Sequence, residues 1–141
     1  MLVLSRKPDE RVFIGADFIV TLVGIYHLVA RLRLESSTPF YALTAAEFNT
    51  LYGNPFVYDG RPHPVDLTRL GRSRRSASFD LRRDQSIVLP ELGWALTITD
   101  VRVGQTRIGF DVPVEIAVHR EEVWEQIYGG GDTTPGERPP P

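Results

Sequence analysis

The chain has no cysteine and only three histidines among its 141 residues. Without cysteine, disulfides and thiolate metal sites are excluded, and a reducing cytoplasm fits. The histidines His27, His63 and His119 lack metal-ligand spacing, and the sequence has neither a GxxxxGK phosphate loop nor an HExxH motif. No nucleophile lies in a recognisable pattern with a base. We therefore expect no bound metal, no cofactor and no enzymatic activity.

Long apolar runs and excess charge are also lacking. No apolar run approaches the roughly 20 residues that span a bilayer. The start, MLVLSRKPDE, is not expected to be a signal peptide, because its apolar part is short and its basic residues come afterwards. The formal net charge is -2, so any nucleic-acid site must be a local patch. We expect a cytoplasmic protein that makes no contact with a membrane.

Strand signals dominate the chain. Several segments are short and apolar or alternate between apolar and polar residues, which is the period of two of a half-buried strand. These segments are residues 2–4, 12–14, 18–23, 30–35, 94–99 and 107–111. Short strands at close spacing predict a mainly β fold.

Two short helices are expected as well. Thr44 and Glu47 have the spacing of a capping box, and Phe48 and Leu51 form the apolar face of the helix that follows. Residues 120–127 place two acids in a first turn, where the helix dipole favours them, and a run of glycines ends this helix. Its expected apolar face consists of Val123, Trp124 and Ile127.

An internal repeat is the most informative feature of the sequence. When the chain is shifted by 76 residues, many apolar, Thr and Arg positions coincide. Phe18 falls on Trp94, Val20 on Leu96, Thr21 on Thr97, Leu22 on Ile98, Arg31 on Arg107, Leu32 on Ile108 and Tyr52 on Tyr128. Each copy therefore comprises five short strands and one helix. The expected units are copy 1 (1–52), a linker (53–75), copy 2 (76–128) and a disordered tail (129–141).

Three motifs carry a family resemblance: MLVLSRK at residues 1–7, RIG at 107–109 and VHREE at 118–122. In combination they resemble the carbon storage regulator (CsrA/RsmA) family. The resemblance implies intertwined β-sheets, which members of the family form as homodimers. It also implies binding of GGA motifs in mRNA leaders and repression of translation. In this chain, two fused copies would form a monomeric pseudo-dimer.

The resemblance also implies composite RNA sites, in which the first strand of one copy lies beside the fifth strand of the other. The matching residues are Leu4, Ser5, Arg6 and Lys7 in copy 1, and Ile116, Ala117, Val118, His119 and Arg120 in copy 2. The opposite site carries Phe79, Leu81, Leu43 and Thr44 in place of Leu4, Arg6, His119 and Arg120. Both halves of that site are expected to have lost their cations. The sequence therefore predicts one working site.

The chemistry of the expected site is suited to RNA. A guanidinium can meet guanine O6 and N7 with two parallel bonds, phosphates attract cations, and Arg6, Lys7 and Arg120 supply such donors. Structural roles stay open at this point: Arg6 and Arg120 can be solvated or paired with a carboxylate, Leu4 can belong to the core, and His119 can be structural. Asp9, Asp111 and Val114 depart from residues common in the family and leave fewer cations nearby.

Two functions follow from these patterns. The first is an RNA-binding post-transcriptional regulator that recognises single-stranded or hairpin RNA with a GGA motif. The alternative is a protein-interaction module with little RNA binding, which engages a FliW-type partner or antagonises a CsrA-type regulator. Linker arginines form either a basic arm for RNA or a solubilising segment: Arg69, Arg72, Arg74 and Arg75.

Overall fold

The structure, a computed structural model, describes residues 1–63, 66 and 69–129. The expected disordered tail lies outside these residues from position 130 onward. The first half contains β1 (Leu2–Arg6), β2 (Arg11–Ile14), β3 (Phe18–Tyr26), β4 (Val29–Phe40), β5 (Leu43–Thr44) and α1 (Ala45–Tyr52). The second half contains β6 (Arg74–Leu81), β7 (Ser86–Leu89), β8 (Trp94–Arg102), β9 (Gln105–Asp111), β10 (Val118–Arg120) and α2 (Glu121–Tyr128).

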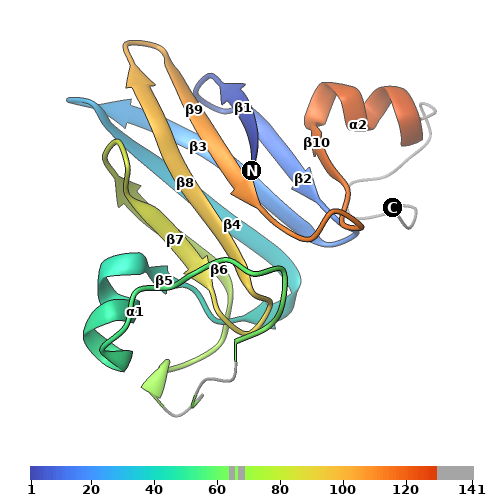
Figure 1. Ribbon diagram of the computed structural model, residues 1–141. Coiled ribbons are helices and arrows are strands. Elements are labelled where there is room, and N and C mark those ends of the chain that lie inside the picture. The colour runs from blue at the N-terminus through green and yellow to red at the C-terminus, as the bar shows by residue number, and fades with distance from the viewer. Residues whose placement is uncertain (64–65, 67–68, 130–141) are drawn as a thin grey trace.

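The strands form two five-stranded antiparallel sheets (Figure 1). Their orders are β1-β9-β8-β7-β5 and β10-β2-β3-β4-β6. Each sheet takes its three central strands from one half of the chain and both edge strands from the other half. Neither half can complete a sheet alone, so the halves are intertwined. The predicted mainly β fold of two intertwined units is confirmed.

The two halves also share the details of their turns. Asp9 N–H donates to Leu22 O at 2.7 Å, and Asp84 N–H donates to Ile98 O at the same distance. Asp9 and Asp84 both adopt positive φ, at 72° and 68°. The register of the central strand pair shifts directly after Leu22 in one sheet and directly after Ile98 in the other. These matches lie 75 or 76 residues apart, in agreement with the repeat seen in the sequence.

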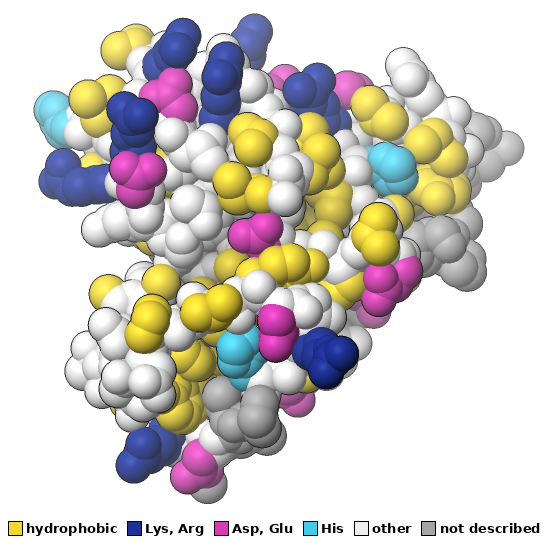
Figure 2. All heavy atoms as spheres, viewed as in Figure 1, with side chains coloured by type: hydrophobic (Ala, Val, Ile, Leu, Met, Phe, Trp, Pro, Cys, Tyr) yellow, Lys and Arg dark blue, Asp and Glu magenta, His cyan; other side chains and the backbone are white. Residues whose placement is uncertain are grey.

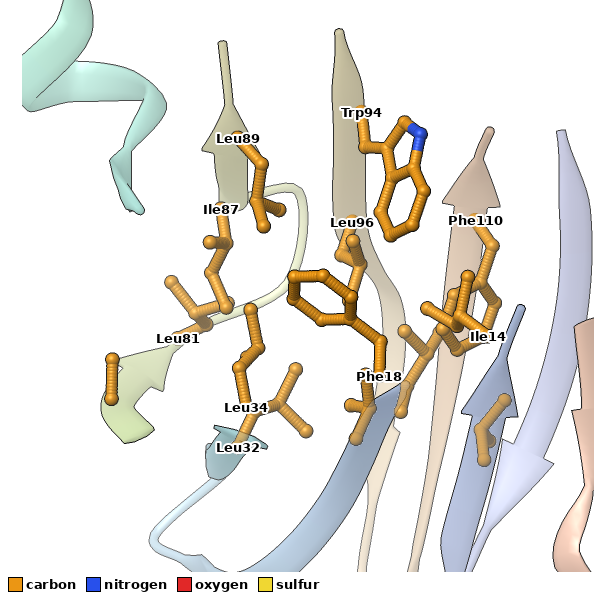
Figure 3. Close-up of a cluster of buried hydrophobic side chains, with 14 of the residues drawn as sticks. Ile14, Phe18, Leu32, Leu34, Leu81, Ile87, Leu89, Trp94, Leu96 and Phe110 are labelled. Atoms are coloured by element: carbon orange, nitrogen blue, oxygen red, sulfur yellow. The ribbon is translucent and has the colours of Figure 1, made fainter. Parts of the chain in front are cut away.

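The hydrophobic core lies between the sheets. Its most buried side chains come from both halves, and Leu22, Leu32, Ile87 and Ile98 are at most 1% exposed. Burial of each such side chain stabilises the fold by roughly 1.5–3 kcal/mol. Figure 3 shows side chains of the two sheets facing one another across this layer. The core therefore depends on both halves equally.

Both helices are short and anchored by one ring each. The predicted capping box is present at α1, where Thr44 Oγ1 accepts from Glu47 N–H at 3.1 Å. Phe48 and Trp124 are buried, and Trp124 meets Phe13 edge-on with ring centroids 4.9 Å apart. The wider apolar faces predicted for the helices are wrong. Three of their residues point outward, because a two-turn helix touches its sheet along a narrow stripe: Leu51, Val123 and Ile127.

The segment after α1, residues 53–63, packs across the turn between β7 and β8 (Figure 1). Phe56 contacts Phe48 edge-on, with ring centroids 5.4 Å apart. His63 N–H donates to Pro90 O at 2.8 Å. The Arg61 carbonyl lies so close to Gly93 that a Cβ there would have no room, and Gly93 has φ of 75°. The first part of the connection is therefore held against the sheet.

Within the described residues, no helix is long and apolar enough to cross a membrane.

Candidate nucleic-acid interface

Two strands of the predicted site, β1 and β10, are edge strands of different sheets. They meet at one end of the molecule, which we call the β1–β10 end together with the start of α2 (Figure 1). The Arg6 guanidinium donates to both Glu122 carboxylate oxygens, each at 2.8 Å. Leu4, Ile116 and Val118 are partly buried against the same core. The fold therefore brings the two predicted groups of residues together across a distance of more than 100 positions in sequence.

Arg6 is held firmly within this end. Its side chain is 4% exposed, and besides Glu122 it donates to Ser5 O at 2.7 Å and Arg11 O at 3.1 Å. Four of the five guanidinium N–H groups have partners. Of the roles left open by the sequence, pairing with a carboxylate is the one seen for Arg6. Its contact with RNA stays a prediction, since few of its donors are free.

Two acids at the start of α2 fix the helix to the β1–β2 hairpin. The hydrogen bonds from Arg6, aided by a backbone N–H at the helix start, lower the pKa of Glu122 to about 2. Glu121 forms a second ion pair, in which one of its carboxylate oxygens accepts from the Arg11 guanidinium. Sequence reasoning attributed both acids to the helix dipole and missed these ion pairs. Two adjacent acids directly after Arg120 could have indicated these ion pairs, because the helix dipole alone does not explain why both positions are acidic.

Two cations of the predicted site remain available. Lys7 is exposed, and neither Lys7 nor Arg120 forms an ion pair within the part of the chain that the structure describes. Arg120 precedes α2 in an extended conformation, and its side chain makes no cap hydrogen bond. Its Nε is buried and lacks a hydrogen-bond partner among the described residues. A buried donor without an acceptor is costly, and unlike Arg6 the Arg120 guanidinium is not held by a carboxylate among the described residues.

The free edge of β10 offers backbone groups as well. Ala117 O accepts from Gly15 N–H at 2.8 Å, and β10 runs antiparallel to β2 with His119 opposite Phe13. Bonded pairs alternate along an antiparallel ladder, so the backbone groups of Val118 and Arg120 face away from β2. The His119 ring lies on the α2 side, 6.4 Å from the Tyr128 ring. The edge of β10 therefore offers donors and acceptors for base edges.

A pocket of about 370 Å³ lies between the beginnings of β1 and β10. We call this pocket the slot. Its lining includes Met1, Leu2, Tyr58, Asp111, Pro113 and Val118. Tyr58 belongs to the segment after α1, and burial with the nearby Asp111 and Glu115 carboxylates raises its pKa. Sequence reasoning missed Tyr58, because no pattern in the chain indicates where the connection between the halves would pass.

The opposite end of the molecule, the β6–β5 end, has equivalent positions but different residues. Leu81 pairs with Ala30 of β4 as Arg6 pairs with Thr106 of β9. In the same way, Phe79 occupies the position of Leu4. Leu43 and Thr44 pair with Val88 and Ile87 as His119 and Arg120 pair with Phe13 and Val12. The register thus gives the same correspondences that the sequence repeat suggested.

The β6–β5 end replaces an ion pair with apolar packing. Leu81 is 1% exposed and lies beside Ile87 in the core (Figure 3). Ala45 and Ala46 begin α1 where Glu121 and Glu122 begin α2. A pocket of about 320 Å³ at this end is lined by Thr44, Ala45, Ala46, Asp80, Leu81 and Asp84, among others. Asp80 is paired with Arg31, and the Asp84 carboxylate opposes the binding of phosphate.

One detail of the sequence prediction needs correction. Both halves of the second site were expected to have lost their cations. The turn after β6 places Arg82 where Lys7 follows β1, since Arg82 N–H donates to Gln85 and Lys7 N–H donates to Glu10 in the same way. One cation is therefore retained at the β6–β5 end. The difference between the ends lies at the positions of Arg6 and Arg120.

Figure 2 shows Lys and Arg side chains gathered along the upper edge of the molecule in that view. Exposed Arg107 lies beside Ser5 of β1 in the register. The largest pocket described, about 480 Å³, is different: its wall includes the rings of Phe18, Phe40 and Trp94 and the acids Asp17 and Glu91. It has no cation among its lining residues. Phosphate binding is therefore favoured near β1 rather than in the largest pocket.

Residues 81–128 match the model of the CsrA global regulator protein family. The matched part contains β7 to β10 and α2, and it carries His119 and Arg120. This part of the chain is similar to the CsrA family. CsrA-like proteins are RNA-binding regulators and not a family of enzymes. The match begins at Leu81, the last residue of β6, so the rest of the altered first strand of the second half lies outside it. The search of solved structures found no match.

Proposed function

We propose that the protein is a post-transcriptional regulator that binds GGA motifs in mRNA leaders through the β1–β10 end alone. Occupation of a leader at its ribosome-binding site would repress translation. The proposal includes a tandem duplication, in which the copies at residues 1–52 and 76–128 form a monomeric pseudo-dimer. The duplication would join the two subunits of a homodimer with two equal sites into one chain, which keeps one of these sites.

The observation that carries this proposal is the meeting of two free strand edges at one end. β1 and β10 come from opposite ends of the sequence, and the bidentate Arg6–Glu122 ion pair joins them. Strand edges of this kind offer backbone donors and acceptors to the edges of unstacked bases. Arg120 adds a guanidinium whose Nε has no partner among the described residues. These groups suit guanine, which presents O6 and N7 as acceptors.

Arg6 has a positioning role in this proposal. Its ion pair with Glu122 fixes the start of α2, and Arg120 is the residue directly before that helix. The placement of the Arg120 guanidinium therefore depends on a contact made by β1. Lys7 lies exposed at the end of β1 and supplies a cation for a neighbouring phosphate.

Titration with two labelled RNA hairpins tests the proposal. One hairpin carries GGA in its loop, and the other carries CCA at the same place. We expect the GGA hairpin to bind on the order of tenfold more tightly or better at fixed salt, because lost guanine contacts cost about 1–3 kcal/mol each. Equal affinity for both hairpins would favour the alternative, a protein-interaction module that engages a FliW-type or CsrA-type partner.

A further inference from the structure

In the part of the segment between the two halves that the structure describes, Tyr58 reaches the β1–β10 end. The segment is not part of the internal repeat, so the repeat does not explain why an aromatic ring lies at this place. Tyr58 is partly buried in the wall of the slot, beside Met1 and Leu2 at the beginning of β1. An aromatic ring beside a site for unstacked RNA offers a platform on which a base can stack.

Contacts on both sides of Tyr58 hold the segment in place. Before Tyr58, the Phe56 ring packs on Phe48 and on His63, at centroid distances of 5.4 and 4.3 Å. After Tyr58, the His63 ring nitrogen Nε2 forms a hydrogen bond with Val57 O, at 2.9 Å. The backbone of Arg61 crosses over the turn between β7 and β8. The position of Tyr58 is therefore set by packing, as a preorganised binding residue requires.

The slot has the dimensions and the lining of a site for one small planar group. Its volume of about 370 Å³ lies at the lower end of the range of roughly 300–1,000 Å³ for ligand pockets. Its mouth is apolar and open, since Met1, Leu2 and Val114 are 69%, 45% and 100% exposed. The Met1 side chain covers Gly109, where a Cβ would collide with the Met1 sulfur.

One carboxylate lies among these apolar groups. Asp111 lines the slot, and one of its oxygens is 3.7 Å from the Met1 amino group. A carboxylate accepts hydrogen bonds, so it favours bases that carry an exocyclic amino group over uracil. Asp111 also disfavours phosphate in the slot. A base with its backbone outside the slot therefore fits better than any other part of an RNA chain.

We infer that the slot binds one nucleobase that flanks the GGA motif, stacked on Tyr58 and bonded to Asp111 through an exocyclic amino group. This inference rests on the proposed function. The β1 and β10 strands both run from the slot toward Arg6 and Arg120, so a base in the slot and the GGA motif occupy successive positions along one groove. The connection between the halves thus becomes part of the binding site.

Stacking can be measured directly with the full chain. GGA hairpins are prepared with a fluorescent adenine analogue at the nucleotide before the motif or at the nucleotide after it. We expect quenching of one of the two probes when the wild-type protein binds. With Tyr58→Leu, this quenching should disappear and affinity should fall about tenfold, whereas Tyr58→Phe should retain both properties. Tyr26→Leu is the matched control, since Tyr26 is an exposed tyrosine at the end of β3.

A second experiment removes the base from the RNA. An abasic nucleotide at the quenched position should weaken wild-type binding about tenfold, and Tyr58→Leu should add no further loss on this RNA. GGA-dependent binding with no quenched probe, or with no effect of the abasic nucleotide, would overturn the inference that the slot binds a base. The proposed function would still stand. Loss of the preference for GGA over CCA in the wild type would overturn both.

Discussion

The two ends of the molecule occupy equivalent places in the fold and differ in a few side chains. At the β1–β10 end, the buried Arg6 forms a bidentate ion pair with the half-exposed Glu122. At the β6–β5 end, Leu81 lies in the core and Ala46 stands where Glu122 would be. The same backbone therefore tolerates an ion pair or apolar packing. This difference teaches that polar groups at the β1–β10 end are not needed for folding.

Buried ion pairs are seldom favourable for stability, because desolvation costs about as much as attraction returns. The β6–β5 end shows that this fold has an apolar solution at the same position. Because the Glu122 side chain is 54% exposed, solvent screens this ion pair and its contribution to stability is only about 1 kcal/mol. We therefore attribute a role in function to it. Placement of Arg120 at the start of α2 is such a role.

The largest effect is expected when a cation is forced into the β6–β5 end. Leu81→Arg places a guanidinium in the core, where Ala46 stands in place of an acid equivalent to Glu122, and we expect a loss of about 3–5 kcal/mol in the free energy of unfolding. The double variant Leu81→Arg/Ala46→Glu recreates the ion pair and should recover part of this loss. Urea denaturation measures both. A single variant as stable as the wild type would mean that this end is not packed as described.

RNA affinity should distinguish the two ends next. Arg120→Ala removes a charge-assisted contact on the order of 1–3 kcal/mol, which weakens binding of a GGA hairpin about tenfold to hundredfold. Thr44→Ala, at the equivalent position, should leave RNA affinity unchanged. Titrations at one salt concentration measure both.

Thr44→Ala needs a stability control, because Thr44 Oγ1 accepts from Glu47 N–H in the capping box of α1. Loss of this cap should cost about 1 kcal/mol in the free energy of unfolding. Arg120→Ala removes no side-chain cap bond. Melting curves confirm that both variants are folded. Equal losses of RNA affinity in the two variants would remove the distinction between the ends.

Acid sensitivity is expected from the Arg6–Glu122 ion pair at the β1–β10 end. The Arg6 hydrogen bonds lower the pKa of Glu122 from its ordinary 4.5 to about 2. The stabilisation is therefore present above the ordinary pKa and is lost as pH falls from about 4.5 through 2. The Glu122 side chain is 54% exposed, so after screening by solvent we expect only about 1 kcal/mol.

The measurement compares unfolding of the wild type and Glu122→Gln by urea at several pH values. The wild type should lose more stability than the variant between pH 5 and 2. Parallel curves for the two proteins would show that the ion pair does not contribute in solution.

Sequence patterns predicted much of this fold. The repeat gave five strands and one helix per half, and the capping box gave the start of α1. The correspondences of Leu81 with Arg6 and of Thr44 with Arg120 are those of the strand registers. Such features are local or periodic, so they can be recognised from neighbouring or regularly spaced residues in the sequence.

The partners of Arg6 and the position of Tyr58 could not be predicted in this way. Glu122 is more than 100 residues from Arg6, and no short-range pattern links them. The path of residues 53–63 depends on packing against Gly93 and Pro90, which lie in the other half of the chain. Arg120 was found by its motif, whereas its buried Nε depends on how α2 sits beside β2.

The central claim, one RNA site in one chain, is tested most directly by stoichiometry. Light scattering first establishes the oligomeric state, and we expect a mass near the chain's own 15.9 kDa, because the core strands of both halves are present within one chain. Isothermal titration calorimetry with a short GGA hairpin then counts the sites on that species. We predict one hairpin bound per chain, and two equivalent hairpins per chain would contradict the account.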